Sequence, residues 1–129
     1  MNALSGYIEL EMAGQVLPFK FGSNAWALFC EMHKIEFSQI GTSGVFGKVD
    51  GDNISAPDII ALRDLFFCAY QAAMRSRGEL VNLNVDSFGD MLDETKGAVL
   101  KLQEVMLTAK IMGYTFTEMA GESKKKMSH

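Results

Sequence analysis

The sequence predicts a mainly α-helical α+β fold, in which an N-terminal β-hairpin packs on a bundle of about four helices. Three observations favour this fold class. Apolar and polar residues alternate over residues 6–21, apolar residues recur at helical spacing in the later segments, and 129 residues fit one domain. We expect a single globular domain over residues 1–112 and a partly flexible C-terminal tail over residues 113–129.

The hairpin is predicted from two alternating runs around a glycine-containing turn at Ala13–Gln15. Pro18 cannot donate a ladder hydrogen bond, so we expect it at an outward, unpaired edge position. Because an isolated hairpin is marginally stable in water, its apolar face should rest on helices. The residues expected on that face are Ile8, Leu10, Met12, Leu17, Phe19 and Phe21.

Helices are predicted from apolar spacing and from their start and stop signals. Ser23 or Asn24 should cap the first helix and Asn84 or Asp86 the third, while Gly78 should close the long second helix. The second helix is apolar nearly all round, which places it at the centre of the fold. The predicted helical ranges are 24–34, 56–77, 87–94 and 95–112, with a loop over 41–53.

Composition and charge exclude several classes of function. A net charge of −4 and a pI near 5.1 argue against a nucleic-acid partner, since phosphate backbones require a basic face. The longest apolar stretch, residues 59–74, is interrupted by polar residues, so we predict no membrane span. The first residues lack the pattern of a signal peptide, and we expect a cytoplasmic protein. Cys30 and Cys68 lie among apolar residues and are interpreted as buried free thiols.

Five patterns that resemble chemical sites fail in their details. Residues 41–49 lack the first glycine and the final Ser or Thr of a phosphate-binding loop, and residues 50–61 lack two ligands of a calcium loop. His33 has no second metal ligand at helical spacing, and Cys30 beside it lies in an apolar setting that silences a thiol. The acidic group Asp90, Asp93 and Glu94 is interpreted as a solvated helix face. We therefore predict no catalytic, cofactor-binding or metal-binding residues, and no enzyme.

Binding to other proteins is the class of function that remains. The chain has nine methionines, and flexible methionines are common on surfaces that bind several partners. The apolar residues at or beyond the last helix either contact a partner or fold back on the domain, and the outer hairpin strand offers a second docking edge. The predicted partner-binding residues are Tyr7, Phe19, Met112, Tyr114, Phe116 and Met119.

The order of five segments resembles the small tail assembly chaperones of long-tailed phages and prophages. The hairpin opens with residues 6–10 (GYIEL), and residues 17–25 (LPFKFGSNA) lead into an aromatic-rich helix at 26–33. A long helix then ends in a basic, glycine-containing turn at 69–78 (AYQAAMRSRG), followed by residues 85–94 (VDSFGDMLDE). The likeness covers roughly residues 6–94, and these motifs are structural rather than catalytic.

The resemblance implies a chaperone that coats the tape-measure protein, helps recruit the tail tube protein, and leaves before the virion is complete. It also implies self-association and a longer form of the protein made by ribosomal frameshifting, for which codons of Lys124–Lys126 are one candidate position. A solubilising tail is the alternative reading of these lysines. Two other functions stay open: a tail-completion or connector protein that remains in the phage particle, and an unrelated bacterial protein-binding adaptor.

Overall fold

The computed structural model describes residues 6–36 and 56–115. Within them, four consecutive helices follow a two-stranded N-terminal hairpin and precede a second, short strand pair, which is an α+β arrangement that is mainly α-helical. The predicted fold class is therefore confirmed. The elements are β1 (Tyr7–Met12), β2 (Gln15–Lys20), α1 (Ser23–His33), α2 (Ala56–Ser76), α3 (Val85–Asp93), α4 (Ala98–Thr108), β3 (Lys110–Ile111) and β4 (Tyr114–Thr115).

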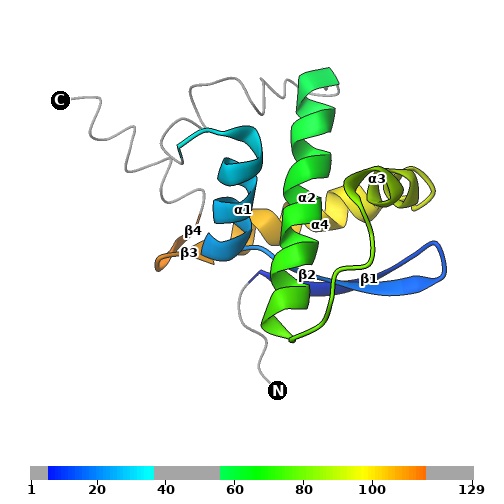
Figure 1. Ribbon diagram of the computed structural model, residues 1–129, viewed down its shortest axis with the longest axis horizontal. Helices are drawn as coiled ribbons and strands as arrows, with labels where there is room; N and C mark the ends of the chain where they lie inside the picture. The colour runs from blue at the N-terminus through cyan, green and yellow to red at the C-terminus, as the bar shows by residue number, and fades with distance from the viewer. Residues whose placement is uncertain (1–5, 37–55, 116–129) are drawn as a thin grey trace.

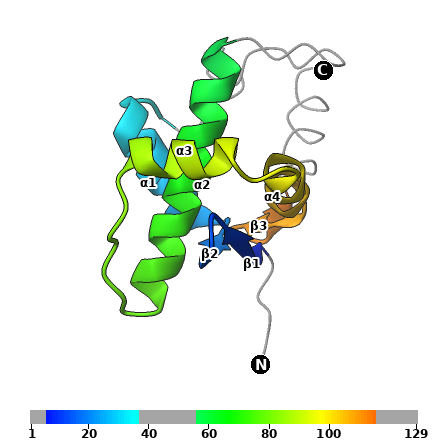
Figure 2. The same ribbon diagram turned by 90° about the vertical axis from the view of Figure 1, so that its right-hand side faces the viewer.

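Helix α2 stands at the centre of the arrangement. Figure 1 shows α1 on one side of it, α3 on the other, and the β1–β2 hairpin crossing its lower half. Figure 2, turned by 90°, shows α3 crossing α2 and α4 lying beside the hairpin. The close contacts agree, because α2 packs on α1, β2 and α3, whereas α4 packs on β1. The position predicted for the long apolar helix is confirmed.

The β1–β2 hairpin is closed by a two-residue turn. Ala13 and Gly14 both have positive φ, 50° and 83°, and Met12 pairs with Gln15. Positive φ at both central residues fits the right-handed twist of the two strands. The inner face is apolar as predicted: Met12 and Phe19 are fully buried, and Leu17 and Phe21 are buried beside them.

Pro18 is buried, so the prediction that it points outward is wrong. The expectation that it needs no ladder hydrogen bond nevertheless agrees with the register. Phe21 N–H donates to the Gly6 carbonyl at 2.8 Å, and bonded and non-bonded pairs alternate along an antiparallel ladder. Pro18 opposite Glu9 therefore falls on a non-bonded pair, where a missing N–H has no cost.

Helix α1 begins without the predicted side-chain cap. Gly22 is the N-cap residue, and neither Ser23 nor Asn24 caps the helix, so that prediction is wrong. The helix ends at His33 because Lys34 turns to a positive φ of 55°. The Ile35 N–H then donates to the Cys30 carbonyl at 3.0 Å, which folds Ile35 back along the helix.

The ends of α2 and α3 follow their sequence signals. Gly78 has a φ of 71°, and the Glu79 N–H reaches back to the Met74 carbonyl at 2.9 Å, which closes α2 as predicted. The Asn84 side chain accepts a hydrogen bond from the Ser87 backbone N–H at 2.8 Å and so caps α3. Of the two predicted cap residues, Asn84 and Asp86, Asn84 is therefore the one that caps α3.

Helix α4 is shorter than the predicted helix over residues 95–112. It ends at Thr108, and Lys110–Ile111 pair with Tyr114–Thr115 around a turn at Met112 and Gly113. Both turn residues have positive φ, 53° and 93°, which a helix cannot accommodate. Backbone pairing thus joins residues 113–115 to the fold, while residues 116–129 of the predicted tail lie outside the described residues.

An aromatic cluster joins the hairpin to two helices. Phe19 of β2, Phe67 and Tyr70 of α2, and Phe88 of α3 have ring centroids 5.6–6.4 Å apart in five of their pairs. Such distances suit offset and tilted aromatic pairs, which add to the burial of apolar area. The Tyr70 hydroxyl donates to Asn82 Oδ1 at 3.3 Å, so the polar end of the ring also has a partner.

Gly6 is expected to tolerate no side chain. Its φ is 84°, and a Cβ atom there would lie 2.3 Å from the Phe21 carbonyl oxygen and 2.7 Å from the Ala109 Cβ. Gly6→Ala should lower the free energy of unfolding, measured by urea denaturation, by about 3 kcal/mol from conformational strain and overpacking. Gly14→Ala is the matched control, because Gly14 has a φ of 83° with nothing nearby. Gly14→Ala should lower the free energy of unfolding by only about 1 kcal/mol. Equal decreases in the two variants would contradict the close contact between Gly6 and Phe21.

Candidate functional site

Cys30 and His33 do not form a nucleophile and base pair in the structure. His33 Nε2 lies 2.9 Å from Asp64 Oδ2, so its side chain is directed at α2. The Phe29 ring covers the imidazole, with centroids 4.4 Å apart. Burial raises the pKa of the Cys30 thiol, which disfavours the nucleophilic thiolate. This geometry supports the structural role that the sequence favoured for both residues.

Asp64 is a charged residue buried in the core, with 5% of its surface exposed. Its Oδ1 accepts from Arg63 Nε at 2.9 Å and lies 2.8 Å from Arg63 Nη2, while Oδ2 faces His33. A buried carboxylate is stable only when its oxygens are paired, and here both are. The sequence analysis did not single out this cluster. The signal available was one acid beside an arginine in an otherwise apolar helix, which gives no position for His33.

The second cysteine is more deeply buried. Burial, with smaller contributions from the negative charge of Asp64 and from Cys30, raises the pKa of the Cys68 thiol to about 12. Both cysteines are free, as predicted. Such a thiol is a small apolar packing group rather than a reactive one.

Neither loop-type site can be placed. The residues weighed for a phosphate-binding loop, 41–49, lie outside the described residues, as does the acidic part of the supposed calcium loop at 50–53. Within residues 6–36 and 56–115, no group of three or more histidine, cysteine, aspartate or glutamate side chains could hold a metal ion. The candidate sites are therefore surfaces.

The first surface is a groove between α1 and the β3–β4 hairpin, called here the α1–hairpin groove, with a volume of about 560 Å³. Trp26 from α1 lies at its base, and Met112 and Tyr114 border it with 82% and 47% of their surfaces exposed. A small share of its lining is polar. Its lining residues are Ser23, Trp26, Ala27, Cys30, Ile35, Glu36, Ile111, Met112 and Tyr114.

The residues predicted to bind a partner separate into three groups. Met112 and Tyr114 lie together on the exposed edge of the α1–hairpin groove. Tyr7 is partly exposed on β1, where its hydroxyl donates to Glu9 Oε2 at 2.8 Å, away from that groove. Phe19 is fully buried in the aromatic cluster, so the structure corrects its assignment to a partner surface. Phe116 and Met119 lie outside the described residues.

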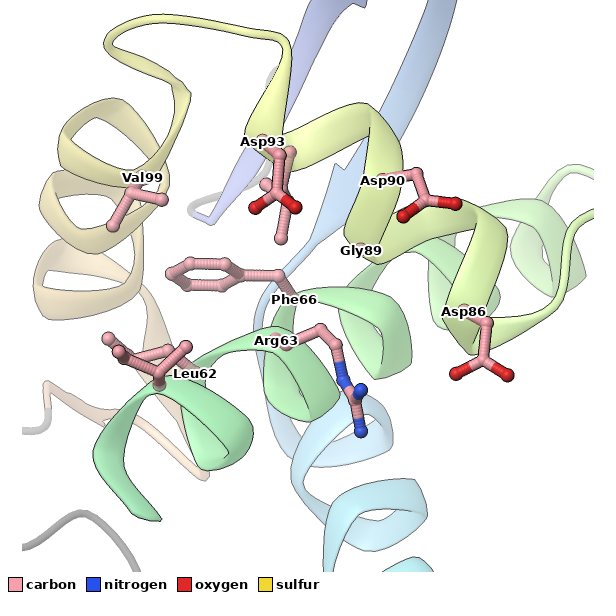
Figure 3. Close-up of a pocket in the computed structure, with 10 residues that line it drawn as sticks. Leu62, Arg63, Phe66, Asp86, Gly89, Asp90, Asp93 and Val99 are labelled. Carbon is pink, nitrogen blue, oxygen red and sulfur yellow. The ribbon is translucent and has the colours of Figure 1, made fainter. Parts of the chain in front are cut away.

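The second surface is a groove between α2, α3 and α4, called here the acidic groove, with a volume of about 570 Å³. Figure 3 shows Phe66 and Leu62 of α2 facing Val99 of α4, with three aspartates following α3. Sequence reasoning recognised Asp90 and Asp93 as an exposed acidic face but missed the groove beside them, since the apolar floor comes from other helices. Its lining residues are Ile59, Leu62, Arg63, Phe66, Asp86, Gly89, Asp90, Leu92, Asp93 and Val99.

Comparison with protein families, curated proteins and solved structures finds no match for this chain. None of the helices in the described part of the chain is long and apolar enough to cross a membrane.

Removing the Asp64 carboxylate should destabilise the protein. Asp64→Ala leaves Arg63 and His33 without their acceptor, and we expect the free energy of unfolding to fall by about 2 kcal/mol in chemical denaturation. Glu104→Ala, at an exposed position on α4, should change it by less than about 0.5 kcal/mol. A loss at Asp64 no larger than at Glu104 would mean that the cluster does not stabilise the packing of α1 on α2.

The two thiols should differ in reactivity. At pH 8, a thiol with a pKa of about 12 is ionised in only about one molecule in ten thousand. We expect iodoacetamide to leave Cys68 unmodified in the native protein, to modify the less buried Cys30 slowly, and to modify both rapidly in urea. Mass spectrometry of the tryptic peptides measures each site. Native modification of Cys68 at the rate found in urea would refute its burial.

Proposed function

We propose that this protein is a phage tail assembly chaperone, which binds exposed apolar segments of the tape-measure protein and keeps that protein soluble until the tail tube encloses it. The observation that supports binding is the α1–hairpin groove, where apolar side chains from two elements remain open to solvent. Large exposed apolar surfaces are typical of protein-binding sites. The identity of the partner comes from the order of segments over residues 6–94, which resembles this family.

The composition of the groove fits repeated, weak binding. Met112 is unbranched and polarizable, so it adapts to partner side chains of different shape, and Tyr114 adds a rigid aromatic surface. A long helical protein offers many apolar stripes, and many weak contacts along it give a stable coat. Each single contact stays weak enough for displacement by arriving tail tube subunits. The net charge of −4 opposes aggregation of the coated complex.

Under this proposal the protein performs no chemistry, acts in the host cytoplasm, associates with itself and is absent from the finished virion. A longer frameshifted form belongs to the same proposal. A tail-completion or connector protein would instead remain in the particle, so mass spectrometry of purified virions separates the two functions. For an unrelated bacterial adaptor, the gene would not lie just upstream of a very long tape-measure gene.

Co-expression tests the chaperone function. The tape-measure protein encoded beside this gene should be soluble when it is co-expressed with this chain and should co-purify with it. Met112→Ser combined with Tyr114→Ser should reduce the co-purified amount at least about fivefold, because burial of these two side chains contributes to binding. The measurement is densitometry of the soluble fraction and of the affinity eluate.

Leu80→Ser supplies the matched control, since Leu80 is 89% exposed but lies in the α2–α3 connection, away from the groove. It should leave co-purification unchanged. The function is refuted if the tape-measure protein is equally soluble without this chain. The groove assignment is refuted if the double variant binds as the Leu80→Ser variant does.

A further inference from the structure

The acidic groove combines an apolar floor with negative charge along one edge. Phe66 is fully buried and Leu62 nearly so, and together with Val99 they close the groove between α2 and α4. Ile59, at the open end, keeps 57% of its surface exposed. Ile59 and the half-buried Leu92 and Val99 form an apolar strip that still meets solvent, and covering such a strip with an apolar partner is favourable.

Three carboxylates border this strip. Asp86, Asp90 and Asp93 are spaced by four and three residues, so they lie on one face of α3. All three are exposed, and none forms an ion pair with another residue in the described part of the chain. The negative charge of this edge is therefore available to a partner.

The one basic residue in the lining does not neutralise that edge. Arg63 binds Asp64 through both Nε and Nη2, and Figure 3 shows its guanidinium pointing away from Phe66 and Val99. Gly89 lets α3 lie close above the Arg63 stem, because a Cβ atom there would be 3.2 Å from Arg63 Cδ. The aliphatic part of the Arg63 side chain thus lines the acidic groove, while its guanidinium is paired with Asp64.

We propose that the acidic groove is a docking site for an amphipathic helix of another protein, with leucine-like side chains on the floor and lysine or arginine side chains beside the three aspartates. The first and last carboxylates are seven positions apart on α3, or about 10 Å along its axis. Basic residues at i, i+4 and i+7 of a partner helix have the same spacing. A single small cation would meet only one or two of the carboxylates.

The proposal does not depend on the identity of the partner in the preceding section, and it concerns a different surface. The α1–hairpin groove has one charged residue, Glu36, in its lining, whereas three aspartates border the acidic groove. Opposite charges on the rim raise the rate of encounter and reject partners of the wrong sign. The two grooves therefore select different sequences: one takes apolar segments in general, and the other takes apolar segments with a basic edge.

A titration with a designed helical peptide tests the proposal. The probe is a fluorescein-labelled peptide with leucines at i, i+3, i+4 and i+7 and lysines flanking that stripe, and the readout is fluorescence anisotropy with the full chain. The triple variant Asp86→Asn, Asp90→Asn, Asp93→Asn should bind at least about tenfold more weakly. Binding to the wild-type chain should also weaken between roughly 50 mM and roughly 500 mM salt.

Matched controls separate the groove from general charge. The variant Glu11→Gln, Glu31→Gln, Glu104→Gln removes three exposed acids elsewhere and should retain the wild-type affinity. Gly89→Leu places a side chain against Arg63 and fills the groove, so it should lose affinity at least about tenfold while its thermal melting stays cooperative. A peptide of the same composition with its leucines spread around the helix should bind at least about tenfold more weakly than the probe.

Several results would overturn the proposal. The proposal is wrong if the probe does not bind at millimolar concentration, or if the peptide with its leucines spread around the helix binds as tightly as the probe. It is also wrong if the two triple variants bind the probe equally well, or if a folded Gly89→Leu variant keeps the wild-type affinity. Sedimentation of the protein without peptide measures self-association, which tests whether a second copy of the chain occupies the groove. If the three Asp→Asn changes abolish self-association and leave peptide affinity unchanged, a second copy of the chain occupies the groove and the proposal is wrong.

Discussion

The burial of α2 on nearly all sides is the constraint on which the rest of the structure depends. From Ala61 to Met74, most side chains of this helix are buried, and a helix that is apolar all round is stable only when neighbours cover each face. Helix α1, strand β2 and helix α3 provide that cover. The aromatic cluster is one example of this cover: Phe19 of the hairpin and Phe88 of α3 both pack against Tyr70 of α2.

Asp64 is a buried charged residue of this apolar helix, and its neighbours offset the free-energy cost of burying a carboxylate. Placing an unpaired carboxylate in the core would be strongly unfavourable, but Arg63 and His33 approach it from opposite oxygens. His33 belongs to α1, so the pairing requires α1 to pack at one position along α2. The same charge contributes to the raised pKa of the Cys68 thiol on the next turn. A polar group thus gives the packing of two apolar helices a defined register.

Both grooves are lined mainly by apolar side chains, and only the acidic groove includes residues of α2. Ile35, Ile111 and the buried Trp26 line the α1–hairpin groove, whereas Phe66 of α2 and Val99 of α4 line the acidic groove. Figure 1 shows α1 and the β3–β4 hairpin on one side of α2 and α3 on the other, with α4 crossing behind α2. The grooves differ in charge, since Met112 and Tyr114 border the first and aspartates the second. Under the two binding proposals, these surfaces would take two different kinds of segment.

The sequence by itself determined the fold class, the central place of α2, the inward face of the hairpin and the end of α2 at Gly78, and it limited the cap of α3 to Asn84 or Asp86. Each of these follows from local spacing or from backbone conformations that few residues adopt. It placed Pro18 outward and gave the inward-facing Phe19 a second role in partner binding, and both predictions are wrong, because side-chain exposure depends on which neighbours arrive from distant segments. It also extended the last helix to residue 112, since the helical spacing of apolar residues includes Ala109, which lies just beyond the end of α4 at Thr108. The Asp64 cluster and both grooves were decided by tertiary structure alone, because each is built from residues on two or three separate elements whose mutual approach no local pattern encodes.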